Sequence, residues 1–114
     1  FNSEERFAVA SPVFIKRFIN GNVEHILYDH PQADEFLTET LQRKLRQAGL
    51  PADNVRVQFD RTYPSPQTKL LSFNGINNKA SLCPVIVSGT PEQVAFAWSV
   101  GVGNSTGIGF GALR

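Results

Sequence analysis

Several features that would assign this chain to a specialised class of protein are scarce. Its single cysteine, Cys83, allows no disulfide within the chain and no cysteine-based metal site. No apolar run approaches the roughly 18 residues that cross a bilayer, and no signal peptide is visible. Eleven Lys and Arg against ten Asp and Glu leave a net charge of +1, so a polyanion would have to bind a local patch. We therefore expect a cytoplasmic protein without a membrane partner, a metal or a cofactor.

The composition is that of one packed domain. Apolar residues make up 41% of the 114 residues, and nine of them are phenylalanines. A chain of this length buries roughly two-thirds of its unfolded surface in a single core. Cys83 lies in an apolar run, so we expect a buried structural thiol. The sequence begins at Phe1 without Met and soon enters a strand-like stretch, so we interpret residues 1–114 as one domain of a longer protein.

The first third of the chain predicts strands. Residues 6–18 are rich in Phe, Val and Ile, and Pro12 predicts an edge position or a bulge among them. Asn20 and Gly21 separate this run from residues 23–28, and Asn-Gly between apolar runs predicts a tight hairpin. The pattern therefore predicts a β-hairpin before the first helix.

The next segment predicts a helix. Leu37, Leu41 and Leu45 recur at four-residue spacing after Pro31 and form one apolar face. Gly49 supplies a left-handed cap. Three basic residues fall in the late turns, where the helix dipole favours positive charge, and we assign them to stabilising that end: Arg43, Lys44 and Arg46.

The second half predicts three more strands and a helix. Residues 55–59 alternate with period two, and residues 69–73 and 82–87 are also strand-like. We expect the polar residues 74–81 to be an irregular connection, and residues 108–113 to form a short final strand. A helix begins after Thr90, with Val94, Ala97 and Trp98 facing the core; its start is marked by Thr90, Pro91 and Gln93.

This order of elements predicts an α+β fold. Strand, helix, strand, strand, helix, strand is the βαββαβ order of a ferredoxin-like sandwich, in which two helices cover one face of an antiparallel sheet. The Asn20-Gly21 hairpin would be an additional N-terminal β-hairpin on that sandwich.

Residues 101–111 form the most unusual stretch. Glycine tolerates positive φ and lets the backbone approach a ligand closely, and exposed N–H groups in such loops can bind anions. Neutral side chains between the glycines suit phosphate oxygens and sugar hydroxyls. We predict that this loop binds RNA, against the alternative of a flexible turn, through Gly101, Gly103, Asn104, Ser105, Thr106, Gly107, Gly109 and Gly111.

Two phosphate-binding motifs can be excluded for this loop. A Walker loop needs Gly-Lys-Ser/Thr, and the loop contains no lysine. A dinucleotide-binding fingerprint opens a helix after a strand, whereas this loop follows a predicted helix.

The glycine pattern resembles the C-terminal signature of the RAMP superfamily of CRISPR-associated proteins. More narrowly, it resembles CRISPR repeat-processing endoribonucleases, which end in a Gly-apolar-Gly loop that runs into a Gly-Phe-Gly strand. Ser11-Pro12 in its apolar strand, the segment from Asp29 into the helix, the strand before Gly89 and the helix before Gly101 match in the same order. The resemblance covers nearly all 114 residues.

The resemblance implies a protein of two tandem ferredoxin-like domains, of which this chain would be the C-terminal one. It implies metal-independent cleavage of precursor CRISPR RNA, in which a 2′-hydroxyl attacks the adjacent phosphate and leaves a cyclic phosphate and a 5′-hydroxyl. The catalytic histidine of better-known members lies in the first domain, so we expect no catalytic residue here. The implied partners are RNA, the missing N-terminal domain, and either a second copy or subunits of a CRISPR effector complex.

A few polar residues outside the loop are further candidates. Lys16, Arg17 and Lys79 could pair with phosphates along an RNA groove. His25 and His30 are the fallback catalytic pair, because histidine titrates near neutrality. Tyr63 could stack on a base and Arg114 could contact a phosphate.

Three alternatives stay open at this point. The first is a non-catalytic RAMP subunit that binds guide RNA. The second is an RRM-like module, because residues 107–112 echo an RNP1 strand. The third is a small-molecule regulatory domain on the same sandwich. The leading hypothesis predicts that Gly109→Val with Gly111→Val weakens RNA binding and leaves the fold intact.

Overall fold

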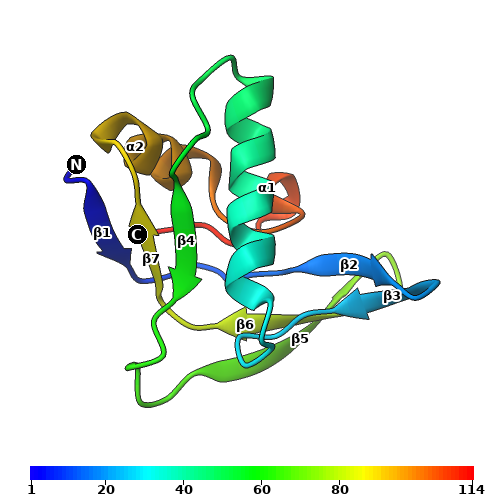
Figure 1. Ribbon diagram of the computed structural model, residues 1–114. Coiled ribbons are helices and arrows are strands. Elements are labelled where there is room, and N and C mark those ends of the chain that lie inside the picture. The colour runs from blue at the N-terminus through cyan, green and yellow to red at the C-terminus, as the bar shows by residue number, and fades with distance from the viewer.

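A computed structural model describes all residues from Phe1 to Arg114, and Figure 1 shows how they are layered. The elements are β1 (Glu4–Phe7), β2 (Lys16–Ile19), β3 (Asn22–His25), α1 (Ala33–Gln47), β4 (Arg56–Phe59), β5 (Gln67–Phe73), β6 (Ile76–Leu82), β7 (Val85–Ser88), α2 (Pro91–Val100) and the 3₁₀ turn η1 (Thr106–Ile108).

The main sheet has β7 at its centre. β1 pairs with one edge of β7 and β4 with the other, both antiparallel. Beyond β1, Leu113 forms a bridge with Val9, so the C-terminal segment lies where a fourth strand would be. The resulting order, C-terminal segment, β1, β7, β4, is that of a ferredoxin-like sheet. The predicted α+β fold class is therefore confirmed.

The core lies between this sheet and the two helices. Alternate residues of β4 and β7, such as Val57 and Val87, are fully buried, as the period-two pattern requires. Leu37, Leu41 and Leu45 are buried along α1 and belong to the same cluster, which confirms the predicted helix face. This single core places both helices on one face of the sheet (Figure 1).

Two hairpins extend from the body of the domain (Figure 1). The predicted hairpin is β2–β3, and its turn residues Asn20 and Gly21 have φ of 51° and 81°. The second hairpin, β5–β6, corrects the sequence prediction, because residues 76–82 form a strand and not an irregular connection. Its turn, Asn74-Gly75, is the same Asn-Gly signal. The polar residues after it obscured a strand that is exposed over much of its length.

Helix α2 begins with the capping box that its sequence indicates. Thr90 accepts a hydrogen bond from the N–H of Gln93, and the Gln93 side chain accepts one from the N–H of Thr90. The placement of Trp98 in the core is wrong, since its side chain is 49% exposed. It lies about 100° around the helix from buried Ala97, and the Phe1 ring lies beside it at 6.0 Å.

The two strands expected nearest the C-terminus also differ from the prediction. Residues 108–113 form no strand; the segment starts in η1, turns, and pairs only at Leu113. The strand expected over 82–87 divides at Cys83 and Pro84, because proline has no N–H for a sheet ladder. Cys83 is 1% exposed, as expected, and burial raises the pKa of its thiol. Neither helix is long and apolar enough to cross a membrane.

Asp60, which follows β4, is a buried carboxylate. Its oxygens accept hydrogen bonds from Arg6 Nε at 2.5 Å and from the hydroxyl and N–H of Thr62. The bonds from Arg6 and then from Thr62 lower the pKa of Asp60 to about 2, from an ordinary 3.8. The ionised group therefore stabilises the fold above about pH 4, and this stabilisation is lost as the pH falls towards 2.

We expect Asp60→Asn to lower the urea midpoint at pH 7 and to differ less from the parent protein as the pH falls from 4 to 2. The reason is that the parent loses its carboxylate charge in that window and the variant has none to lose. Urea titrations at several pH values measure this. Asp53→Asn, at an exposed position, is the control and should change little. A difference in urea midpoint between parent and Asp60→Asn that is the same at pH 2 and pH 7 would contradict the prediction.

Candidate nucleic-acid interface

Three of the five loop glycines are buried packing positions. A Cβ on Gly101 would lie 2.9 Å from the carbonyl oxygen of Gly111, and one on Gly103 would lie 2.4 Å from that of Phe14. On Gly111 a Cβ would lie 1.9 Å from the carbonyl oxygen of Val102. All three glycines have positive φ, between 67° and 82°. Gly101, Gly103 and Gly111 therefore let backbone segments touch, and they do not offer an open surface for RNA.

Backbone hydrogen bonds tie the loop to itself and to the segment before β2. The N–H of Val102 donates to Gly111 and the N–H of Gly111 donates to Pro12. The N–H of Asn104 donates to Phe14 at 2.7 Å. Phe110 is buried and packs against Phe14, with ring centroids 5.0 Å apart. These contacts hold the loop against the segment before β2 and favour a structured turn over a flexible one.

A buried Phe110 also corrects the RRM-like interpretation. An RNP1 strand presents its aromatic rings on an open sheet surface. Here residues 107–112 form no strand, and the only aromatic ring among them is inside.

The middle of the loop is open to solvent. Ser105, Gly107 and Gly109 are exposed, and a Cβ on Gly107 or Gly109 would meet nothing within 4 Å. The N–H groups of Ser105, Thr106 and Gly107 donate to no protein acceptor. Adjacent N–H groups that lack a protein acceptor are the kind of donors with which loops bind anions.

The polar side chains of the loop hold it in place. The amide oxygen of Asn104 accepts hydrogen bonds from the N–H of Lys16 at 2.8 Å and from the Arg17 guanidinium at 3.2 Å. Lys44 Nζ donates to the carbonyl oxygen of Gly103 at 3.1 Å and to the hydroxyl of Thr106 at 3.2 Å. The loop is therefore attached by side chains to both β2 and α1.

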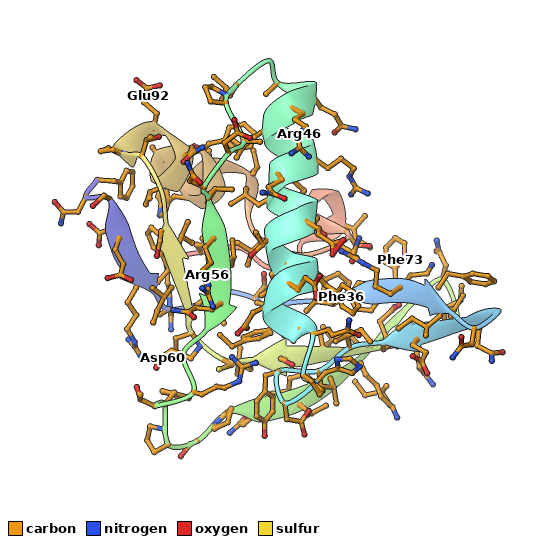
Figure 2. All side chains as sticks on the ribbon, viewed as in Figure 1. Phe36, Arg46, Arg56, Asp60, Phe73 and Glu92 are labelled. Carbon is orange, nitrogen blue, oxygen red and sulfur yellow. The ribbon has the colours of Figure 1, made fainter.

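A basic hollow of about 320 Å³ lies beside this attachment. Arg17 is fixed in it, because its guanidinium donates to the carbonyl of Phe36 and the hydroxyl of Thr40 and lies 4.8 Å above the Phe36 ring. Figure 2 shows Phe36 on the turn of α1 beside β2. Lys16 and Arg43 also line the hollow and are exposed, so three cations stand against one carboxylate, that of Glu39. Burial lowers the pKa of Arg17, but its high ordinary value keeps it charged.

The sequence assigns Arg43 and Lys44 only to the end of α1. The structure places Arg43 in the basic hollow and Lys44 beneath the loop. Their adjacency in the sequence gives no sign of this, because the contact joins residues about 60 positions apart along the chain. Arg46 lies further towards the C-terminal end of α1, outside the hollow (Figure 2).

Lys44 gives a prediction about pH. Burial lowers the pKa of Lys44 to about 8, with the charge of Arg43 contributing in the same direction. Between pH 8 and an ordinary 10.5 the unfolded chain keeps a proton that the folded chain has released, so this group makes the fold more stable as the pH rises. Between pH 7.5 and 10 we expect the free energy of unfolding of the parent to rise by about 1–2 kcal/mol more than that of Lys44→Met. This range allows for the partial exposure of Lys44. Denaturant unfolding of both proteins at each pH measures the gain. Lys69→Met, at an exposed lysine, should show none; parallel curves for Lys44→Met would refute the prediction.

The structure brings both histidines to a second hollow, of about 420 Å³, which Lys79 also lines. His25 Nδ1 accepts a hydrogen bond from the N–H of Lys79, and His30 Nδ1 accepts one from the N–H of Gln32. Burial, Lys16 and Lys79 lower the pKa of His25. Neutral imidazoles with Nδ1 occupied carry their proton on Nε2, so both can donate a hydrogen bond to an anion. No group of three His, Cys, Asp or Glu residues is arranged to hold a metal ion.

A family model described as "CRISPR associated protein Cas6, C-terminal" matches residues 1–114. The chain belongs to this family. Among curated protein sequences, none matches this chain significantly. The resemblance inferred from the glycine loop is therefore confirmed at the level of the family.

Solved structures with the same fold agree. One described as "CRISPR associated protein Cas6" superposes with a TM-score of 0.81 at 19% identity, covering 96% of this chain and 47% of its own. A Cas6-related protein from Pyrococcus furiosus gives 0.79 at 18% identity, covering 99% and 48%. A protein described as "An RAMP protein binding different RNA substrates" gives 0.78 at 20% identity, covering 100% and 49%. The chain thus spans about half the length of these relatives.

Proposed function

We propose that this domain binds CRISPR repeat RNA on a surface we call the loop face, formed by Lys16, Arg43 and residues 104–109. One observation carries the proposal: three free, adjacent amides lie in a loop that is fastened to the edge of a basic hollow. Amides and cations in a fixed arrangement suit the phosphates of an RNA backbone and read no base. The membership of the Cas6 C-terminal family, and the description of one structural relative as binding RNA substrates, support RNA as the polyanion.

The whole protein, on this proposal, is a metal-independent endoribonuclease. A general base takes the proton of the 2′-hydroxyl, whose oxygen attacks the adjacent phosphorus. The bond from phosphorus to the 5′ oxygen breaks, and a general acid protonates that oxygen, so the products are a 2′,3′-cyclic phosphate and a 5′-hydroxyl. On this proposal the domain contributes RNA binding, and the acid and base lie outside residues 1–114; the greater length of the structural relatives, about twice that of this chain, is consistent with this.

Two assays with a labelled CRISPR repeat RNA, both without metal, test the proposal. The first is a gel shift with this domain, and the second is cleavage by the full-length protein and by the domain alone. We expect binding by the domain and cleavage only by the full-length protein. His25→Ala and His30→Ala should leave the rate of cleavage by the full-length protein unchanged.

Other results would favour other functions. Binding by both proteins with no cleavage by either would indicate a non-catalytic subunit that assembles on guide RNA. Cleavage by the domain alone would place the reaction at the hollow of His25, His30 and Lys79. No binding to RNA, together with thermal stabilisation by a small metabolite, would favour a regulatory domain.

A further inference from the structure

A third hollow, of about 350 Å³, lies beside the turn that follows β4 and shares no lining residue with the basic hollow. We call it the Tyr63 hollow. Residues 8–10 and 82–84 give it a largely apolar lining, and Arg6, Tyr63 and Arg114 supply its polar groups. Figure 2 shows Asp60 at this end of β4, where the chain leaves the sheet.

Asp60 fixes both sides of the Tyr63 hollow. One carboxylate oxygen accepts from Arg6 Nε and the other from Thr62, while the carbonyl of Asp60 accepts from the N–H of Tyr63. The carboxylate side chain is 6% exposed, whereas that of Arg6 is 50% exposed. A buried acid therefore orients an arginine that is half open to solvent, together with the turn that carries Tyr63.

Donors and one ring remain free in this arrangement. Arg6 uses Nε for Asp60, and its two terminal nitrogens donate to no protein acceptor. The Arg114 backbone is fixed by its N–H, which donates to Ala8 at 2.9 Å, and its side chain makes no hydrogen bond to the protein. Tyr63 is 36% exposed. Asp60 balances the charge of Arg6, whereas Arg114 has no carboxylate partner, and no carboxylate lines the hollow itself.

We propose that the Tyr63 hollow binds one unpaired nucleotide of the RNA, with the base stacked on Tyr63 and a phosphate bound by Arg6 and Arg114. This inference rests on the proposed RNA-binding function. A planar ring beside paired guanidinium groups suits a base with its phosphate, because aromatic rings stack on any base and guanidinium groups bind phosphate oxygens in pairs. The C-terminal segment connects the two surfaces: Gly109 lies in the loop face, and Arg114, five residues later, lines the hollow. Five residues span at most about 18 Å, so a short RNA strand can reach both.

Equilibrium binding of a repeat RNA by this domain tests the inference. Tyr63→Leu should weaken binding about tenfold, as expected for the loss of one stacked base, and Tyr63→Phe should bind like the parent. Arg114→Gln should weaken binding several-fold and reduce the salt dependence of log affinity by about 0.7, because one phosphate contact is lost. Arg56→Gln is the matched control, since Arg56 is exposed on the same sheet and does not line the hollow. Arg114→Gln leaves the Asp60–Arg6 pair intact, so its effect is separate from folding.

Photocrosslinking gives a second measurement. RNA that carries 4-thiouridine should crosslink to a peptide containing Tyr63, and a tenfold excess of free nucleoside monophosphate should not prevent it. Parent affinity in both Tyr63→Leu and Arg114→Gln, with crosslinks only elsewhere, would overturn the Tyr63 hollow and leave RNA binding at the loop face. Efficient competition by a mononucleotide would show that the Tyr63 hollow binds a free nucleotide and not a nucleotide of an RNA strand. Failure of the parent domain to bind RNA at all would remove the proposed function first.

Discussion

Gly111→Ala is expected to prevent this domain from reaching its native fold. The new Cβ would lie 1.9 Å from the carbonyl oxygen of Val102, and this neighbour is backbone, not a movable side chain. The φ of 67° adds a left-handed conformation that costs alanine about 1–2 kcal/mol. Val102 cannot retreat easily, because its N–H donates to the carbonyl of Gly111 itself. We expect a loss of more than about 3 kcal/mol, or an insoluble protein.

Two neighbouring glycines provide graded controls for this result. Gly107→Ala meets nothing within 4 Å and has no positive φ, so its stability should stay within about 0.5 kcal/mol of the parent. A Cβ on Gly109 would also meet nothing within 4 Å, but the φ of this residue is 106°. Gly109→Ala should therefore lose only the stability that the backbone strain costs. Urea unfolding ranks the stabilities of the three alanine variants. The soluble fraction replaces it for any variant whose unfolding cannot be measured. Equal stability of the alanine variants at 107 and 111 would contradict this account of the loop.

The same geometry corrects the design of Gly109→Val with Gly111→Val as a probe of RNA binding. That double variant was expected to keep its fold, but valine at 111 would collide with Val102. Any loss of RNA binding in it would report misfolding. Gly107 is the better position at which to alter the open part of the loop, because a Cβ there would meet nothing within 4 Å and its φ is not positive.

The largest expected effect on binding comes from Lys16→Gln with Arg43→Gln. Both side chains are exposed and line the hollow beside the loop, so their removal leaves no buried partner unsatisfied. We expect repeat-RNA affinity to fall on the order of 30-fold, as for the loss of two phosphate contacts. The dependence of log affinity on log salt should fall by about 1.4. Fluorescence anisotropy across a salt series measures both.

A control with the same change of charge distinguishes a local surface from a general effect. Arg56→Gln with Lys69→Gln removes one arginine and one lysine at exposed positions that do not line the basic hollow. We expect this pair to retain most of the affinity. An equal loss in the two double variants would show that bulk charge, and not the loop face, governs binding.

The features that the sequence alone determined are local ones. The Asn20-Gly21 hairpin, the leucine face of α1 and the cap formed by Thr90 and Gln93 depend on residues a few positions apart, and the structure has all three. The glycine pattern of residues 101–111 also indicated the family, and the family model that matches the whole chain confirms it. The misplaced elements were those whose local signals were mixed, such as β6 with its polar residues.

Only the tertiary structure decided which parts of the candidate surface are open. Gly103 and Gly107 are the same residue in one loop, yet the first is packed against Phe14 and the second faces solvent. Lys44 lies beneath that loop and Tyr63 shares a hollow with Arg114, although each pair is far apart in sequence. Such differences arise when segments far apart in the chain meet, and each contact depends on how the whole core packs. Local propensity and residue spacing do not describe that packing. The sequence therefore identified the loop, and the structure identified its exposed part.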